Sequence, residues 1–165
     1  MINLPDYKKI HCIGIGGIGL SAVAEILMAR GYDISGSDMR ESDMTAKLAH
    51  DGAQIYIGHK AENVDGKDLI IYSSAISMEN PELAKAKELG IPAVTRAQAL
   101  GALMAEYDSS IAISGTHGKT TTTSMVSLIL KNAHKEPTIL VGGNLPEING
   151  NVYVGQNDYF VTEAC

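Results

Sequence analysis

The clearest sign of chemistry in this sequence is a phosphate-binding loop in its second half. Residues 114–121 read Ser-Gly-Thr-His-Gly-Lys-Thr-Thr and lie between an apolar stretch and a run of good helix formers. Gly115 and Gly118 permit a bent backbone whose successive N–H groups can surround phosphate oxygens. The ammonium of Lys119 can bridge the β- and γ-phosphates of a nucleotide, and the Thr120 hydroxyl can ligate Mg²⁺.

This loop departs from the usual pattern at one position. The pattern G-x-x-x-x-G-K-[ST] requires a first glycine where this chain has Ile113. The alternative, a chance Gly-Lys-Thr in a surface turn, is disfavoured by the expected strand before the loop and helix after it. His117 lies inside the loop, where it can either hydrogen-bond a ligand or only fix the turn.

A carboxylate near the last residue of the chain could complete a metal site. Glu163 ends the β-rich run Tyr-Phe-Val-Thr-Glu, which places it at the carboxyl end of an expected strand. Ligands bind at that edge of parallel sheets, and a carboxylate there can bind Mg²⁺ or order its waters. The alternative is an ordinary glutamate at a strand end. Thr120 and Glu163 are therefore the candidate metal ligands.

A second glycine loop lies near the N-terminus. Residues 14–19 read Gly-Ile-Gly-Gly-Ile-Gly and match G-x-G-x-x-G between an expected strand and helix. Gly14 permits the tight turn, Gly16 lets a pyrophosphate approach the backbone, and Gly19 lets helix and strand pack closely. Asp38 follows the next strand, where an acidic residue commonly binds a ribose. NAD, FAD and sugar nucleotides all remain open as ligands, as does a turn that serves only packing.

The elements that must position these residues alternate between strand and helix. Strands are predicted at 9–14, 33–36, 54–57, 68–73, 91–94, 109–114, 138–141 and 159–162, and helices at 18–30, 45–51, 81–89, 96–106 and 119–132. This alternation predicts an α/β fold with parallel sheets and right-handed crossovers. We expect a Rossmann-like domain over 1–107 and an incomplete P-loop α/β domain over 108–165.

Two further expectations concern individual side chains. The last helix is expected to bury Met125, Val126, Leu128, Ile129 and Leu130. Surface positions are expected for His59 and His134.

Composition excludes several classes of protein. The 165 residues are 45% hydrophobic and 19% charged, which is ordinary for a globular chain and unlike a disordered one. A net charge of −6 argues against a surface that coats nucleic acid. The two cysteines have no metal or redox spacing, which favours a reducing compartment.

Lys8-Lys9 before an apolar run resembles a signal peptide, but the glycines of the first loop argue against a signal helix. No run is long and apolar enough to span a membrane.

Together, the two loops resemble those of the bacterial Mur ligases. The resemblance extends from about residue 11 to residue 165 and is strongest at 14–19 and 112–121, with further matches at 34–38, 73–76, 80–81 and 162–165. The form Ala-x-x-Gly-Thr-x-Gly-Lys-Thr is specific to this superfamily and accounts for the missing first glycine. The histidine in that loop points to the members that use L-alanine or to the related murein-peptide recycling ligases. The first glycine loop favours the former.

The resemblance implies a cytoplasmic enzyme of peptidoglycan synthesis whose three domains bind a UDP-sugar, ATP with Mg²⁺, and an amino acid. Such an enzyme phosphorylates the lactyl carboxylate of UDP-N-acetylmuramate, and the amine of L-alanine then attacks the acyl phosphate. Matching positions imply UDP-sugar contacts at Gly14, Gly16, Gly17, Ile18, Gly19, Asp38, Ser73 and Ser74. They imply ATP contacts at Gly115, Thr116, His117, Gly118, Lys119, Thr120 and Thr121, with Mg²⁺ at Thr120 and Glu163. Lys119 would be catalytic, because it would neutralise charge on the transferring phosphoryl group.

The third domain of that family has no counterpart in these 165 residues. We therefore expect a fragment that binds UDP-N-acetylmuramate but does not catalyse ligation, with L-alanine bound only by the missing domain. Neither a nucleic acid nor a membrane is expected as a partner. One alternative is an NAD(P)-dependent oxidoreductase, which leaves the second loop unexplained. Another, for the fragment by itself, is a non-catalytic module that binds UDP-sugars.

Overall fold

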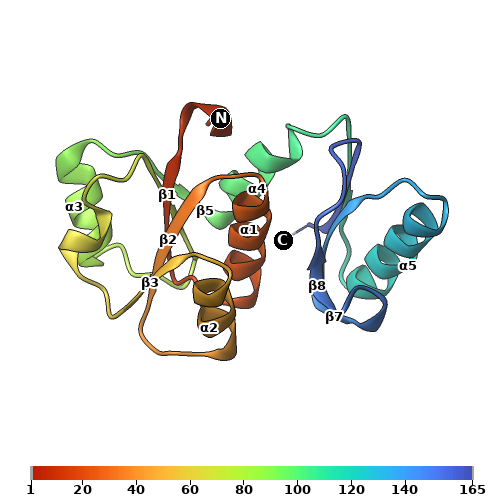
Figure 1. Ribbon diagram of the computed structural model, residues 1–165, viewed down its shortest axis with the longest axis horizontal. Coiled ribbons are helices and arrows are strands. Elements are labelled where there is room, and N and C mark those ends of the chain that lie inside the picture. Colours follow the sequence, from red (N-terminus) through yellow and green to blue (C-terminus); the bar gives the residue numbers. More distant parts are fainter. Residues whose placement is uncertain (1, 165) are drawn as a thin grey trace. The chain divides into compact units, whose positions relative to one another are not determined.

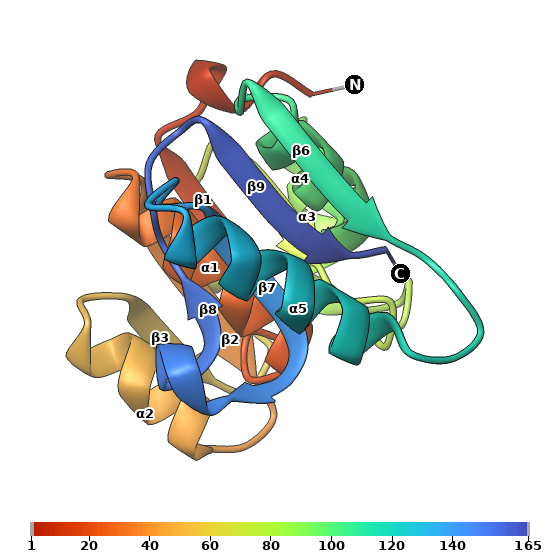
Figure 2. The same ribbon diagram turned by 90° about the vertical axis from the view of Figure 1, so that its right-hand side faces the viewer.

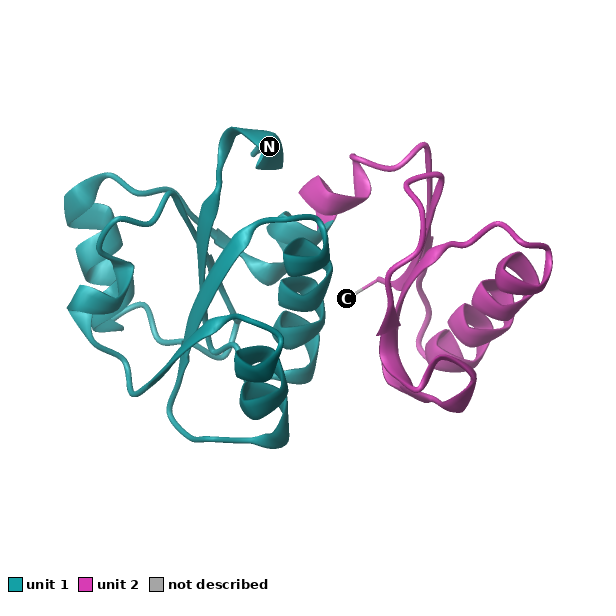
Figure 3. Cartoon of the chain, viewed as in Figure 1, with its two compact units in different colours: residues 1–100 teal, residues 101–165 magenta. Residues whose placement is uncertain are grey.

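The computed structural model describes residues 2–164. The chain divides near residue 100 into two compact units, which Figure 3 colours separately. Unit 1 comprises residues up to Leu100, and unit 2 begins at Gly101.

Unit 1 is built on a parallel sheet of five strands in the order β3-β2-β1-β4-β5. These strands are β1 (Lys9–Ile13), β2 (Asp33–Asp38), β3 (Gln54–Ile57), β4 (Leu69–Tyr72) and β5 (Ala93–Thr95). The chain runs outward from β1 to β3 and then returns to β4 on the other side of β1. Ligands of open α/β sheets bind outside the carboxyl ends of the strands at such a reversal.

Helices cover both faces of this sheet. Figure 1 shows α3 on one face, with α1 and α2 on the other. The helices of unit 1 are α1 (Ile18–Ala29), α2 (Asp43–His50) and α3 (Pro81–Leu89), and the short 3₁₀ turns are η1 (Leu4–Asp6) and η2 (Ala61–Val64). Helix α4 (Arg96–Met104) begins in unit 1 and ends in unit 2. The side chain of Asn80 caps α3 by accepting hydrogen bonds from two amides of its first turn. The helix ends at Gly90, whose φ of +71° suits glycine.

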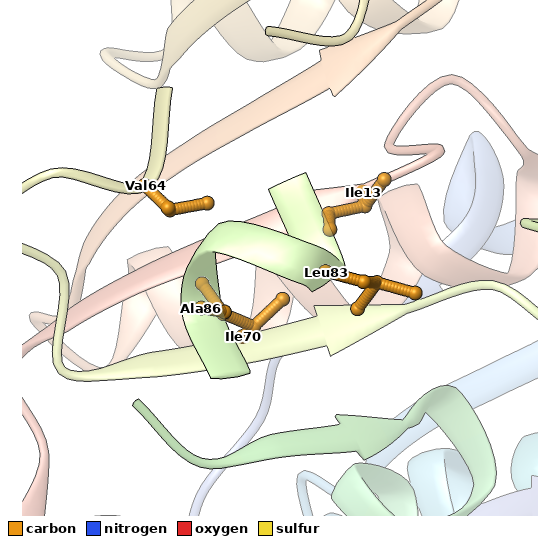
Figure 4. Packing of buried hydrophobic residues seen from close by; sticks show 5 residues of the cluster. All are labelled: Ile13, Val64, Ile70, Leu83 and Ala86. Carbon is orange, nitrogen blue, oxygen red and sulfur yellow. The ribbon is translucent and has the colours of Figure 1, made fainter. Parts of the chain in front are cut away.

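The core beneath α3 is apolar. Figure 4 shows Ile13 and Ile70 of the sheet packed against Leu83 and Ala86 of α3, with Val64 beside them. All five side chains are buried. Burial of side chains of this kind fixes α3, and with it Glu82, against the sheet.

Unit 2 contains a mixed sheet of four strands in the order β6-β9-β7-β8. Its elements are β6 (Ser109–Ile113), α5 (Lys119–Asn132), β7 (Thr138–Leu145), the 3₁₀ turn η3 (Pro146–Ile148), β8 (Gly150–Tyr153) and β9 (Tyr159–Glu163). Strands β6, β9 and β7 are parallel, whereas β8 is antiparallel to β7. Figure 2 shows α5 lying across one face of this sheet.

The α/β fold class with a parallel Rossmann-like sheet is confirmed, but the sequence did not predict all of unit 2. Strand β7 continues beyond the predicted strand 138–141 through Gly142 and Gly143, and β8 was not predicted. The expected buried face of α5 is wrong at Met125 and Ile129, which are 58% and 64% exposed. The fully buried positions of α5 include Thr123, a small residue whose hydroxyl bonds the carbonyl of Lys119. None of the described helices is long and apolar enough to cross a membrane.

Candidate functional sites

The glycine loop of unit 1 is anchored on the neighbouring strand β2. The amides of Gly14 and Ile15 both donate to the carbonyl oxygen of Ser37, at 2.8 and 3.1 Å. The amide of Gly17 donates to the carbonyl of Gly14 and closes the turn. Gly14 has a φ of +83°, a conformation that side chains rarely adopt. The turn into α1 therefore has a single, hydrogen-bonded geometry.

Two amides at the start of α1 remain available to a ligand. Ile18 and Gly19 begin the helix, and within residues 2–164 neither amide has a hydrogen-bond acceptor. Their N–H groups and the helix dipole favour an anion at this point. The guanidinium of Arg96 lies beside them, because a Cβ added to Gly19 would be 3.1 Å from its Nε. Sequence reasoning missed Arg96, although it follows β5 at the carboxyl edge of the sheet, where a ligand would bind.

Asp38 contacts the same loop. Its Oδ2 accepts a hydrogen bond of 2.9 Å from the amide of Gly16. A Cβ on Gly16 would lie 2.9 Å from that oxygen and 3.2 Å from Cγ2 of Thr45. The carboxylate of Asp38 therefore fills the space that a side chain at position 16 would need. In the described part of the chain, Oδ1 of Asp38 has no hydrogen-bond partner. The carboxylate is thus oriented by the loop, and one oxygen is left to accept a bond.

The two serines predicted at this site lie after β4. Ser73 packs against the loop, since a Cβ on Gly14 would be 3.2 Å from its Cβ. The amide of Ser73 donates to the carbonyl of Ile13. Ser74 follows in the same loop and is exposed. The carboxyl ends of β1, β2 and β4 therefore bring together the glycine loop, Asp38 and Ser73, with Ser74 at the solvent side.

A buried carboxylate lies behind β2. Glu82 of α3 is fully buried, and its Oε1 accepts from Nε2 of His11 at 3.2 Å and from Nδ2 of Asn63 at 2.7 Å. Its Oε2 accepts from the hydroxyl of Ser37 at 2.7 Å and from Nδ1 of His59 at 2.8 Å. Four donors from four segments of the chain thus converge on one carboxylate.

These contacts determine the charge of Glu82. Burial by itself would raise the pKa of this carboxyl, but the hydrogen bonds from His11, Ser37 and Asn63 outweigh it, so the pKa lies below its ordinary value. Glu82 is therefore ionised at neutral pH. The expectation that His59 is a surface residue is wrong, because its side chain is only 12% exposed. The second expected surface histidine, His134, is exposed.

A separate hollow of about 580 Å³ opens beside α3. Its lining is mostly apolar and consists of Tyr72, Met78, Leu83, Ala84, Lys87, Ile91 and Ala93. None of the residues predicted to bind a substrate lines it, so it does not belong to the site at the glycine loop.

The phosphate loop of unit 2 joins β6 to α5. Gly118 caps the helix with a φ of +75°, which explains the need for glycine there. Nζ of Lys119 donates a hydrogen bond of 2.6 Å to the carbonyl of Gly115, so the ammonium lies over the loop that precedes it. Thr116, His117 and Thr121 are exposed. The loop and its lysine are accessible to a ligand.

Thr120 and Glu163, the predicted metal ligands, both border β7. Oε1 of Glu163 accepts a hydrogen bond of 2.7 Å from the amide of Gly142, and a Cβ on Gly142 would lie 2.7 Å from Oε2. A Cβ on Gly143 would be 3.5 Å from Cγ2 of Thr120. Glu163 also pairs in register with Ile113, the last residue of β6. Glu163 thus lies beside the start of the phosphate loop, and both predicted ligands lie against consecutive glycines of β7.

This arrangement fits a hydrated magnesium ion better than a cage built only from protein groups. No group of three or more His, Cys, Asp or Glu side chains in residues 2–164 could hold a metal by itself. Mg²⁺ commonly takes one or two protein oxygens and completes its shell with water and substrate phosphates. The Thr120 hydroxyl and the Glu163 carboxylate supply oxygens of the required kind.

Comparison with known proteins identifies the family. The pattern described as "Mur ligase family, catalytic domain" matches residues 9–108, more than half of the chain. The chain belongs to the Mur ligase family. Its relatives include the UDP-N-acetylmuramate–L-alanine ligase of Alkaliphilus metalliredigens, which is 55% identical over 96% of this chain.

Solved structures of Mur ligases agree with this assignment. The UDP-N-acetylmuramate–alanine ligase MurC of Thermotoga maritima is 39% identical, with a TM-score of 0.85 over 94% of this chain and 36% of that one. A UDP-N-acetylmuramate:L-alanyl-γ-D-glutamyl-meso-diaminopimelate ligase from Neisseria meningitides is 28% identical, with a TM-score of 0.84 over 95% of this chain and 52% of that one. The chain spans about a third of the length of the curated relatives it matches, since it covers 34% of the Alkaliphilus ligase.

Proposed function

We propose that this Mur ligase chain is part of an enzyme that joins L-alanine to the lactyl carboxylate of UDP-N-acetylmuramate at the expense of ATP. The observation that supports the proposal most is the placement of three groups around the phosphate loop of unit 2: the Lys119 ammonium lies on the carbonyl of Gly115, and Thr120 and Glu163 lie against Gly143 and Gly142 of β7. An ammonium, a hydroxyl and a carboxylate around a phosphate loop are the groups that phosphoryl transfer requires. The names of the relatives support the choice of substrates.

In unit 1, the glycine loop would hold the UDP-sugar. The amides of Ile18 and Gly19 would bind the pyrophosphate, with the positive charge of Arg96 beside them. Gly14, Gly16 and Gly17 supply the turn that aims those amides. Oδ1 of Asp38 would accept from the ribose, and Ser73 and Ser74 would lie near the uridine or the sugar.

In unit 2, residues Gly115 to Gly118 and Thr121 would surround the phosphates of ATP. The ammonium of Lys119 would exchange the carbonyl of Gly115 for the β- and γ-phosphates and offset their growing charge during transfer. Thr120 and Glu163 would hold Mg²⁺, which when bound neutralises charge on phosphate oxygens. The γ-phosphoryl group passes to the lactyl carboxylate and ADP leaves. The amine of L-alanine then attacks the acyl phosphate and inorganic phosphate leaves.

The chain of 165 residues would bind the UDP-sugar but would not complete ligation by itself. We propose that the full-length enzyme acts in the cytoplasm. The amino-acid site of the family would lie in the third domain. L-Alanine is favoured over a murein peptide as the second substrate, because identity to the L-alanine ligase is 55%, against 28% for the Neisseria ligase.

Titration calorimetry of the 165-residue chain with UDP-N-acetylmuramate and with NAD tests the first part of the proposal. Tighter binding of the UDP-sugar is expected, and preference for NAD would indicate an oxidoreductase instead. Phosphate release by the full-length protein tests the second part. It should require ATP, UDP-N-acetylmuramate and L-alanine together, and the short chain should show none. A requirement for L-alanyl-γ-D-glutamyl-meso-diaminopimelate in place of L-alanine would assign the protein to the recycling ligases.

A further inference from the structure

The hollow beside α3 lies where this helix leaves part of the sheet uncovered. Helix α3 packs on Ile13 of β1 and Ile70 of β4 (Figure 4). Ala93 of the edge strand β5 pairs in register with Ile70, yet it remains exposed. The side chains of Ala84 on the helix and Ala93 on the strand are small, and both line the space of about 580 Å³ that remains. A space of this size is typical of pockets that hold small molecules.

The lining of the hollow is apolar except at two residues. Five of its seven lining residues carry no polar side-chain group, and Leu83 among them continues into the buried core beneath α3. Met78 is 73% exposed, and a flexible methionine at a surface adapts readily to an apolar ligand. The two exceptions are Tyr72, whose ring is half-buried, and Lys87, which is exposed. The hollow therefore offers an apolar wall with a cation at its border.

The ammonium of Lys87 is available to a ligand. Within residues 2–164 it has neither a hydrogen-bond acceptor nor an acidic partner. Lys85 on the same helix differs, because its ammonium pairs with Oε1 of Glu88 at 3.1 Å. A lysine can lay its aliphatic stem along an apolar surface while its charged end stays in water. Lys87 can thus follow an anionic group at the mouth of the hollow.

The neighbouring strand edge favours a small molecule over an extended peptide. Strand β5 has only three residues, and the amide of Thr95 already donates to Oε1 of Gln98 at 2.9 Å. A short edge strand with an occupied amide offers few main-chain groups for pairing with another strand. An occupant must therefore be held by the apolar wall and by Lys87.

We propose that the hollow beside α3 is a second ligand site of unit 1 and that it binds a small organic monoanion with an apolar body, of the size of a medium-chain carboxylate. The apolar body lies against Leu83, Ile91 and the ring of Tyr72, and the carboxylate pairs with the ammonium of Lys87. A neutral molecule of the same shape lacks the ion pair, and a cation is repelled. The site shares no lining residue with the glycine loop, so it does not depend on the binding of a UDP-sugar.

The experiment titrates the 165-residue chain with octanoate, octanamide and octylammonium and follows its backbone amides by NMR. Octanoate is expected to bind with a dissociation constant on the order of 0.1 to 1 mM, roughly three- to tenfold more tightly than octanamide, and octylammonium more weakly than both. The amide signals of Ala84, Lys87 and Ala93 should shift, whereas those of Gly16 and Gly19 should not. Equal affinities for octanoate and octanamide would overturn the recognition of an anion. Shifts confined to other residues would overturn the site.

Two lysines of α3 provide a matched pair of variants. Lys87→Met keeps the apolar stem and removes the charge, so the affinity for octanoate should fall to that for octanamide, which should not change. Lys85→Met removes the same charge from the same helix at a residue that does not line the hollow, and it should leave the preference for octanoate as it is. An equal loss of preference in both variants would show an effect of net charge alone and would overturn the role of Lys87.

Ala84→Phe tests the hollow itself. Ala84 is exposed on α3, so the ring can fill the hollow without entering the core, and the binding of both octanoate and octanamide should be lost. The amide spectrum reports that the variant is folded. Undiminished binding by a folded Ala84→Phe chain would overturn the site.

Two further outcomes would also contradict the proposal. Saturation with UDP-N-acetylmuramate should leave the dissociation constant of octanoate unchanged, and displacement of octanoate would mean that it binds as an adventitious anion at the glycine loop. Light scattering should show no change of mass on mutation of the hollow. A dimer that Ala84→Phe dissociates, together with no binding of octanoate, would assign the hollow to self-association instead.

Discussion

The carboxylate of Glu163 accepts a 2.7 Å hydrogen bond from the backbone amide of Gly142, a residue 21 positions earlier in the chain. The bond joins the end of β9 to the part of β7 where its pairing with β8 shifts register. Glycine is required at this point, because the carboxylate occupies the volume that a side chain would need. The irregular stretch of β7 therefore determines where a proposed ligand of Mg²⁺ lies.

Replacement of Gly142 by alanine should displace Glu163 without unfolding unit 2. The added Cβ would lie 2.7 Å from Oε2, the mobile end of a side chain, so the carboxylate can move aside. In the full-length protein we expect a higher Mg²⁺ concentration for half-maximal phosphate release and at least a tenfold lower rate at limiting Mg²⁺. Gly150→Ala is the control, because nothing lies within 4 Å of its added Cβ. An unchanged Mg²⁺ dependence in Gly142→Ala would remove Glu163 from the metal site.

Gly16→Ala should weaken the binding of UDP-N-acetylmuramate by unit 1. Its Cβ would come within 2.9 Å of Oδ2 of Asp38 and 3.2 Å of Thr45, so the loop and the carboxylate must separate. We expect an affinity loss of about tenfold and a destabilisation of about 1 to 3 kcal/mol. Calorimetry and thermal unfolding measure the two effects. Gly101→Ala, which lies inside α4 and has no neighbour within 4 Å, should leave the affinity unchanged and should not lower the unfolding temperature. Wild-type affinity in Gly16→Ala would mean that this loop does not hold the nucleotide.

Local signals predicted the elements but not the contacts across them. Helix α3 has the predicted bounds because local residues set both ends: Asn80 caps its start, Pro81 is its first residue, and Gly90 ends it. Strand β8 was missed although Asn149-Gly150 is a hairpin signal, and Asn149 indeed has a φ of +55°. The hydrophobicity of α5 suggested the wrong buried positions, because residue type alone does not tell which side of a helix meets the sheet.

The candidate sites were predictable only as sets of residues near strand ends. The sequence indicated Asp38 and the glycine loop, since both follow strands that meet at one edge of a parallel sheet. The contact between His59 and Glu82 joins residues 23 apart on different elements, so no local pattern carries it. No local pattern predicts that Arg96 lies beside Gly19 either, because this contact depends on the position of β5 in the sheet.

Glu82 makes the stability of unit 1 dependent on acid. Its pKa in the folded chain lies below the ordinary value of 4.5, so its stabilising contribution is complete above pH 4.5 and is lost as the pH falls through the folded pKa. Glu82→Gln places an amide nitrogen against buried donors and should cost about 2 to 4 kcal/mol at pH 7. Denaturant unfolding should show that the difference between wild type and variant shrinks below pH 4.5. A difference that stays constant down to pH 3 would show that folding does not lower the pKa of Glu82.

The thiol of Cys12 should be inert in the folded protein. Burial in β1 raises its pKa to about 12, so only about one molecule in 10⁴ carries the reactive thiolate at pH 8. In a Cys165→Ser background, a thiol reagent should label Cys12 over hours in buffer and within seconds in concentrated guanidinium. Saturation of unit 1 with UDP-N-acetylmuramate should slow labelling further, because binding opposes unfolding. Rapid labelling of the native chain would contradict the burial of β1.

Lys119→Ala should abolish ligation by the full-length protein and leave the binding of UDP-N-acetylmuramate to unit 1 unchanged. The two phosphate sites belong to separate strand–loop–helix segments, and the amides of Ile18 and Gly19 do not involve Lys119. Without the ammonium, charge on the transferring phosphoryl group is poorly offset, which typically costs on the order of 10² to 10³ in rate. Lys119→Arg should not restore activity, because a planar guanidinium cannot replace a point charge in the loop. Near-normal turnover in Lys119→Ala would remove this residue from the chemistry, whereas lost affinity for the UDP-sugar at unchanged thermal stability would mean that the two sites are coupled.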